Sequence, residues 1–403
     1  MSSMSRRRRW PKNASRRRPE ARETPMLIGQ REALREIAPY VRSSTATGLA
    51  FFLYDFGLYW AGIAGVLFLP ELWMKVLAAT VAGLKLVSLK TLGHDAAHGC
   101  LVKGKRLNWL LGVIVYAPCL YNYRMWVYDH HVRHHPHTNG PIKDTYTPFT
   151  KAEYDAMPQW RQWLERLYRG PNVIGWSLYY LVERWWDMKL FPRDHMPELH
   201  RKAAWPHFWF LLAYAAVFLG TLTAAPLFTT MSSTQAIVLG AVYPFLVFMA
   251  FTGWGLYLQH THPDATWLRG SNEENKAFYE RGELLAVHWV MPRWFGRLTH
   301  DVMDHPVHHL HPRIPCYRLR VAQARLNQLL GEHALVEKYT LRSFLDTLRR
   351  CKLYDFENHR WLDFDGRPTT GTTRMFRVTA KELLGGKRES AGSRVDPLLL
   401  KAA

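Results

Sequence analysis

Histidines gather in three short clusters of this 403-residue chain, and their spacing is typical of metal ligands. The first cluster has the form HxxxH, and the other two have the form HxxHH. Residues at i, i+3 and i+4 share one face of a helix, so each cluster directs two or three imidazoles the same way. The eight histidines are His94, His98, His131, His134, His135, His305, His308 and His309. We therefore predict a metal centre built from all three clusters.

The number of histidines favours two metal ions over one. A single zinc ion takes about four protein ligands in a structural site and three in a catalytic site. His260, at the end of the last apolar segment, is a ninth candidate beside the eight. Imidazole also suits zinc, copper and nickel, so ligand type alone leaves the metal open. Ligand number favours two iron ions that react with O₂.

Such a centre would remove hydrogen from an unactivated methylene group. The metal supplies this chemistry, and the protein supplies positioning and a dry cavity. Loss of a second, neighbouring hydrogen gives an alkene, whereas return of oxygen gives an alcohol. The spacing of the histidines leaves these two outcomes open.

Other side chains near the clusters are candidates for an additional ligand or for a hydrogen bond to a ligand. Such hydrogen bonds fix the ring and the tautomer of a metal-bound histidine. The candidates are His130, His262, His300, Asp95, Asp144 and Asp301. Either His130 or His131 can begin the second cluster, and the HxxHH spacing favours His131. Each aspartate can equally be a solvated loop residue or a helix cap.

Four apolar segments are long enough to cross a membrane, which takes roughly 20 residues each. Residues 203–263 contain no Asp, Glu, Lys or Arg. We predict spans at about residues 46–70, 72–92, 205–229 and 236–258. Short turns join them in pairs. The predicted fold is an all-α membrane protein, with four transmembrane helices in two hairpins and a cytosolic helical cap that holds a histidine-ligated di-iron site.

Two hairpins place both chain ends and every histidine cluster on one face of the membrane. The formal net charge is +20, and residues 6–9 and 16–18 are all arginine. Lys and Arg accumulate on the cytoplasmic side of membrane proteins. We therefore predict a multi-pass integral membrane protein with its active site on the cytoplasmic face, and we expect no nucleic-acid partner. Residues 1–45 are predicted to be a basic cytosolic tail with a short helix, 46–365 the membrane domain, and 366–403 a flexible C-terminal tail.

This pattern of clusters and apolar segments resembles the membrane fatty acid desaturases, and it is most similar to their acyl-lipid omega-6 (delta-12) branch. The similarity covers about residues 45–365, and its motifs are residues 126–139, 258–263, 298–309, 314–319 and 351–355. The resemblance implies O₂-dependent desaturation of the acyl chains of membrane lipids. It also implies that the eight cluster histidines and His260 bind two iron ions.

The resemblance further implies a separate electron donor, because this chain lacks the HPGG haem motif of a fused cytochrome b5 domain. A ferredoxin or a cytochrome b5-like protein would serve. Arg313, Arg318 and Arg320 follow the third cluster and suit an acidic donor. A hydroxylase or a carotenoid ketolase with the same di-iron site remains an alternative. A metal transporter would place its ligands at mid-membrane depth, whereas these clusters lie outside the predicted spans.

Overall fold

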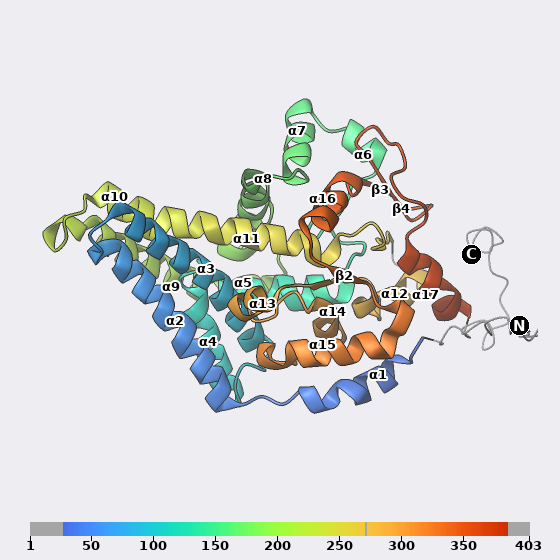
Figure 1. Ribbon diagram of the computed structural model, residues 1–403, viewed down its shortest axis with the longest axis horizontal. Helices are drawn as coiled ribbons and strands as arrows, with labels where there is room; N and C mark the ends of the chain where they lie inside the picture. The colour runs from blue at the N-terminus through green and yellow to red at the C-terminus, as the bar shows by residue number, and fades with distance from the viewer. Residues whose placement is uncertain (1–26, 271, 386–403) are drawn as a thin grey trace, which may run out of the picture.

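Four long, apolar helices run through one half of the molecule, and each is long enough to cross a membrane (Figure 1). The structure is a computed structural model that describes residues 27–270 and 272–385. The four candidate spans are α2 (Thr45–Phe68), α3 (Leu72–Ala97), α9 (Glu198–Thr223) and the stretch Ser233–His260, in which α10 (Ser233–Ile237) and a π-helical segment (Val238–Val242) lead into α11 (Tyr243–His260). The four predicted apolar helices are therefore confirmed. The third begins earlier than predicted, because a polar turn at residues 198–202 precedes its apolar part.

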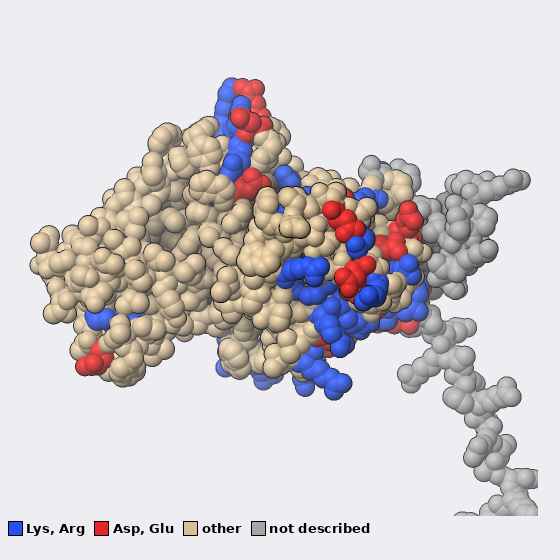
Figure 2. Space-filling model, turned by 90° about the horizontal axis from the view of Figure 1, so that it is seen from above, with Lys and Arg blue, Asp and Glu red and all other residues tan. Residues whose placement is uncertain are grey.

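Charge is segregated along the molecule (Figure 2). On the face shown, nearly all Lys, Arg, Asp and Glu side chains gather on the half that is remote from the apolar helix ends. The outer surface of α9 is apolar, with exposed Trp209, Phe210 and Val217. A continuous exposed apolar surface of this kind is unfavourable in water and suits lipid.

Helix α3 lies at the centre of the apolar half and packs against α2, α11 and α4 (Lys105–Tyr116). Small residues permit this close packing, as they do in membrane helices generally. A Cβ atom on Gly83 would lie 2.8 Å from the carbonyl oxygen of Pro244 in α11. A Cβ atom on Gly93 would lie 2.0 Å from the ring of Tyr116 in α4. These two glycines fix how closely α3 approaches the helices that carry or support the histidines.

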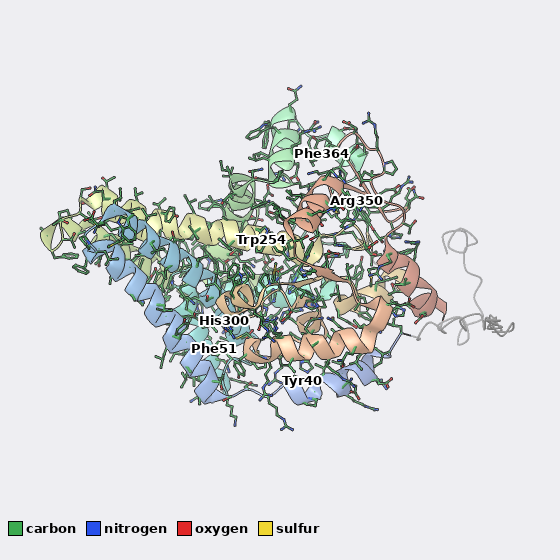
Figure 3. The ribbon with its side chains drawn as sticks, viewed as in Figure 1. Tyr40, Phe51, Trp254, His300, Arg350 and Phe364 are labelled. Carbon is green, nitrogen blue, oxygen red and sulfur yellow. The ribbon has the colours of Figure 1, made fainter. Side chains whose placement is uncertain are left out.

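Three charged residues within the spans, Asp55, Lys75 and Lys85, have partners that account for their position. Lys75 Nζ donates to the carbonyl oxygens of Val66 (3.0 Å) and Leu67 (3.4 Å), at the C-terminal end of α2. Lys85 Nζ lies 2.7 Å from Asp55 Oδ1, and the other oxygen of Asp55 pairs with His300 Nε2. This buried triad joins α2, α3 and the segment that precedes the third histidine cluster. Figure 3 shows His300 beside Phe51 of α2, where this segment meets the spans.

Two polar inserts cover one end of the four long helices. The N-terminal part contributes α1 (Gln30–Ile37) and a 3₁₀ turn (Ala38–Tyr40), where the sequence predicts a short helix. After α4, the first insert contains α5 (Tyr123–Val127), the π-helical segment η2 (Tyr128–His134), the 3₁₀ turn η3 (His135–His137), α6 (Lys151–Asp155), α7 (Gln159–Tyr168), α8 (Val173–Leu178) and a second π-helical segment, η4 (Tyr179–Leu190). A 3₁₀ turn (Ala225–Leu227) lies between α9 and α10.

The second insert follows α11 and includes two short sheets that the sequence analysis did not predict. Its helices are α12 (Glu273–Tyr279), α13 (Arg293–Thr299), α14 (His305–Leu310), α15 (Cys316–Leu330), α16 (Leu341–Arg350) and α17 (Arg374–Gly385), with 3₁₀ turns at Gly282–Leu284 and Gly331–His333. Strand β1 (His288–Val290) pairs in parallel with β2 (Val336–Lys338), and β3 (Leu353–Asp355) pairs antiparallel with β4 (Arg360–Leu362). Each strand has only three residues, too few to give a period-2 pattern.

Helix α17 lies in the segment that was expected to be a flexible tail. Its Met375 and Phe376 are buried, and Phe376 stacks on Phe278 of α12 with ring centroids 5.7 Å apart. The expectation of flexibility therefore does not describe residues 366–385, because an apolar face of α17 packs on the second insert. Residues 1–26 and 386–403, also predicted as tails, lie outside the described residues.

The buried triad leads to a stability prediction. Lys85→Met leaves the Asp55 carboxylate without its cation, and breaking a buried pair in this way costs about 3–5 kcal/mol. We expect a clearly lower unfolding temperature in detergent for this single variant. The double variant Asp55→Asn, Lys85→Met removes both charges and should recover much of the loss. Equal unfolding temperatures for the single and double variants would contradict a paired role for Asp55 and Lys85.

Candidate metal centre

Two groups of four histidines lie side by side at the polar end of the long helices. The ligand nitrogens within each group all lie within 4.8 Å of one another. The first group is His94, His98, His130 and His308, and the second group is His134, His260, His305 and His309. His135 lies between them, with its Nε2 3.0 Å from His308 Nε2. Residues from opposite ends of the chain thus meet in one site.

Five helical segments position these rings. His94 lies in the last turn of α3, and His260 is the last residue of α11. The second cluster lies on η2 and η3, and the third occupies α14. In η2 the chain is π-helical, and π-helical turns are frequent at functional sites. The two long apolar helices therefore end at the site, and the short segments fold over them.

The Nε2 atoms point at one another at a nearly constant spacing. His94 and His308 are 3.0 Å apart at Nε2, and so are His260 and His305. His309 and His305 are 2.9 Å apart. These short separations are compatible with nitrogens that bind a common ion.

The other ring nitrogen, Nδ1, holds several of these rings in place. His94 Nδ1 is 3.0 Å from Asp95 Oδ1, and His134 Nδ1 pairs with Asp144. A carboxylate accepts hydrogen bonds, so both rings carry the proton on Nδ1 and keep a lone pair on Nε2. Asp95 and Asp144 were predicted as hydrogen-bond partners of ligands, and they occupy such positions.

Two further partners were absent from the sequence analysis. His260 Nδ1 is 3.0 Å from Asn139 Oδ1, and the Asn139 amide donates to the carbonyl of Leu285 at 2.8 Å. That second bond fixes the amide orientation, so Asn139 accepts from His260. His309 Nδ1 is 3.0 Å from Thr138 Oγ1. Both residues directly follow the second cluster, which is the one signal in the sequence that points to them.

Burial keeps several of the clustered histidines outside the spans neutral. Burial lowers the pKa of His305, His308 and His309 well below the usual range, and the neighbouring histidines lower it further. Burial likewise lowers the pKa of His131 to about 4. Metal ions bind the deprotonated ring, so a neutral cluster is ready to bind them near neutral pH.

An ion-pair network lies behind the second group. Arg184 bridges Asp144 (2.9 Å) and Asp129 (2.8 Å), and Lys189 also pairs with Asp129. Burial alone raises the pKa of Asp144, but His134 and Arg184 outweigh it and hold this pKa well below its usual range. Asp144 therefore stays ionised and keeps its hydrogen bond to His134.

The second cluster offers two residues for one place in the first group. His130 belongs to the group of four, and its Nε2 is 3.1 Å from His135 Nε2. The ring of His131 lies 4.2 Å from that of His98. The Nε2 atoms of His98 and His131 are buried without a hydrogen-bond partner among the described residues. Unpartnered buried nitrogens facing the same region indicate a missing group such as an ion.

Comparison with known proteins agrees with this geometry. The family model described as fatty acid desaturase matches residues 70–340. This chain belongs to the fatty acid desaturase family. It is 26% identical over 303 residues to the chloroplastic omega-6 fatty acid desaturase of Spinacia oleracea. The matched region covers 75% of this chain and 63% of the length of that relative.

Two proteins of Synechocystis sp. are also similar to this desaturase-family chain. The sn-1 oleoyl-lipid 12-desaturase is 26% identical over 310 residues, covering 76% of this chain and 83% of the relative. The sn-1 acyl-lipid omega-3 desaturase (ferredoxin) is 27% identical over 323 residues, covering 78% and 84%. The predicted resemblance to omega-6 (delta-12) acyl-lipid desaturases is thus confirmed.

Three of the predicted additional residues lie outside both groups. His262 Nε2 is 3.6 Å from Glu337, in a separate polar hollow. His300 pairs with Asp55, as described above. Asp301 has a φ of +51° and lies 3.5 Å from Arg320, and burial raises its pKa. In this structure these side chains support the chain around the third cluster and do not face the ring nitrogens.

The choice between His130 and His131 is open to direct measurement. Because His130 belongs to the first group, we predict that His130→Ala lowers iron per protein as much as His98→Ala does. His131→Ala should retain more iron. Metal content of the purified variants checks this, with His137→Ala as the control from the same cluster. The reverse order would show that the unpartnered Nε2 of His131 faces the ion.

A second prediction concerns Thr138. Thr138→Val keeps the shape of the side chain but removes the hydroxyl that meets His309 Nδ1. Loss of such a partner typically weakens metal binding about 10–100-fold, and we expect this for one of the two ions. Thr138→Ser should restore binding in a metal-competition titration. If Val and Ser bind iron equally well, the hydroxyl does not hold the ring.

Proposed function

We propose that this chain is an O₂-dependent, di-iron desaturase that introduces a double bond into fatty acyl chains linked to membrane lipids. The observation that carries the proposal is the pair of adjoining histidine groups at the end of the apolar helices. The proposed ligands are His94, His98, His130, His134, His135, His260, His305, His308 and His309, with His131, which the sequence favoured, as the alternative to His130. The spacing of the Nε2 atoms and the neutral rings support this set.

The two iron ions, when bound, supply the activation of O₂ and the removal of hydrogen from the acyl chain. The overall reaction uses one O₂, two electrons and two protons, and it converts a –CH₂–CH₂– unit into –CH=CH– with release of two waters. The histidines hold the ions, and Asp95, Asp144, Asn139 and Thr138 hold the rings. A small hollow bordered by His94, His130, His134, His305 and His308 also contacts Tyr180, Leu256 and Leu319.

We further propose that the four apolar helices form two membrane hairpins with the histidines in a cytosolic cap. The turn at residues 69–71 and the connection at residues 224–232 contain no Lys or Arg. The opposite end carries exposed Lys103, Lys105 and Arg313. The positive end of a membrane protein faces the cytoplasm, which supports a cytoplasmic active site. The membrane domain would then comprise residues 46–365.

A separate electron donor completes the proposal. One Synechocystis relative is named for ferredoxin, the sn-1 acyl-lipid omega-3 desaturase (ferredoxin). Exposed Arg313 lies between α14 and α15, and exposed Arg320 lies in the second turn of α15, close in sequence to the third cluster. A small acidic carrier such as a ferredoxin, or a cytochrome b5-like protein, suits such a surface.

Product analysis tests the proposed reaction. We would express the wild type in a host rich in saturated and monounsaturated lipids, with a ferredoxin system, and locate new double bonds by mass spectrometry. We expect a new double bond that is lost in His134→Ala and kept in His195→Ala, since His195 is exposed and outside both groups. A hydroxyl or keto product would instead indicate a hydroxylase or a ketolase. An unchanged lipid profile from iron-loaded protein would contradict an acyl substrate.

A further inference from the structure

An apolar groove opens beside α11, on the membrane side of the metal centre. It encloses about 530 Å³, within the roughly 300–1,000 Å³ typical of ligand pockets. Its lining comes from α3, α8, α11, α13, α16 and the chain next to them, and every described residue in it is apolar or aromatic. Trp254, at its centre, lies on α11 in the middle of the molecule (Figure 3).

The groove lies next to the hollow at the metal centre, because the same segments line both. Trp176 lines the groove and Tyr180 lines the hollow, four residues further along the same helical segment. Leu298, near the end of α13, lines the groove, and Val302, four residues later in the chain, lines the hollow. On α3 and α11 the groove residues likewise precede the hollow residues, by two to ten positions, as with Leu84 and Thr91. One helical turn rises about 5.4 Å, so the groove is roughly one or two turns from the histidines.

The groove is continuous with the surface that would face lipid. Two of its walls, Leu84 and Phe251, belong to candidate spans. Its outer rim carries exposed Trp294 and Val173, each more than half exposed. Tryptophan is enriched where a membrane protein meets the headgroup layer. These features place the mouth of the groove at the edge of the bilayer.

Helix α13 adds two cations at this mouth. Arg293 and Arg297 are exposed on α13, on either side of the groove residues Trp294 and Phe295. Neither forms an ion pair with a side chain in the part of the chain that the structure describes. Arginine binds phosphate through paired hydrogen bonds. Both arginines are therefore available to an anionic group beside this uncharged groove.

We propose that this groove admits one acyl chain of a phosphate-bearing membrane lipid, which enters sideways from the bilayer while its phosphate binds Arg293 and Arg297. The inference rests on the proposed function, because the hollow that the acyl chain reaches is the one at the metal centre. The proposed substrate is therefore a phospholipid. Carriers that approach from the aqueous side, such as acyl-CoA, would not use this route.

Cross-linking in lipid nanodiscs tests the route without any need for turnover. The probe is phosphatidylcholine with a diazirine near the middle of one acyl chain. We expect labelled peptides to contain Trp254 or Phe295. Ala250→Phe places a large side chain in the groove wall and should remove this labelling. Ala213→Phe, on the exposed face of α9, is the matched control and should retain it.

The arginines are tested with the same probe. Arg293→Glu, Arg297→Glu should lower groove labelling about tenfold or more, because two phosphate contacts become repulsive. The control pair Arg31→Glu, Arg35→Glu has the same spacing on the exposed face of α1 and should have no effect. A galactolipid probe with the same acyl chain lacks the phosphate, and its labelling should be insensitive to either pair.

Wild-type labelling confined to other parts of the protein would overturn the groove as the entry route. Equal loss of labelling in both arginine pairs, or no loss in either, would overturn the phosphate contact. These outcomes are separate from the product analysis. If the protein desaturates lipids but the probe labels other parts of it, the proposed function stands and the groove is not the entry route. If the probe labels the groove but no desaturation is found, the entry route stands and the proposed function does not.

Discussion

The structure depends on the requirement that a set of buried imidazoles stay neutral and keep their Nε2 lone pairs directed at one another. A buried cationic ring without a partner is costly, and ten histidines in one place would repel each other if they were protonated. Asp95, Asp144, Asn139 and Thr138 meet the Nδ1 atoms and leave Nε2 free. The rest of the polar half supports this arrangement of rings.

Two levels of support are visible around it. The first level consists of the residues that contact the Nδ1 atoms of the histidines. The second level is the ion pair of Arg184 and Asp129, in which Arg184 also contacts Asp144. At a greater distance, Asp55 and Lys85 anchor His300 and so hold the segment that leads into α14. These contacts connect the membrane helices with the third histidine cluster. Positions of the metal ligands are thus coupled to the packing of α2 against α3.

The position of the site at the end of the apolar helices also explains the choice of substrate. A long acyl chain that remains in the bilayer can reach a site just beyond the ends of α3 and α11 without crossing water. The apolar groove along α11, with arginines at its mouth, is the proposed path for such an acyl chain from the bilayer to the site. Family membership is thus consistent with the proposed metal centre and groove, in which the membrane would supply the substrate and a soluble carrier would supply electrons.

The sequence by itself determined the residue types and the local spacing. It predicted eight clustered histidines as ligands, because i, i+3 and i+4 spacing is a property of a single helix, and it added His260 from its place at the end of the last apolar segment. It also predicted the four apolar helices, because apolar length is local too. It predicted Asp95 and Asp144 as partners because they lie near the clusters. Only the tertiary structure decided which histidines form each group, and it brought His130 into the first group in place of His131. It also gave Asn139 and Thr138 their roles, paired Lys85 with Asp55, and formed the groove. These features depend on contacts between residues far apart in the chain, and such contacts follow from how the helices pack and not from local spacing.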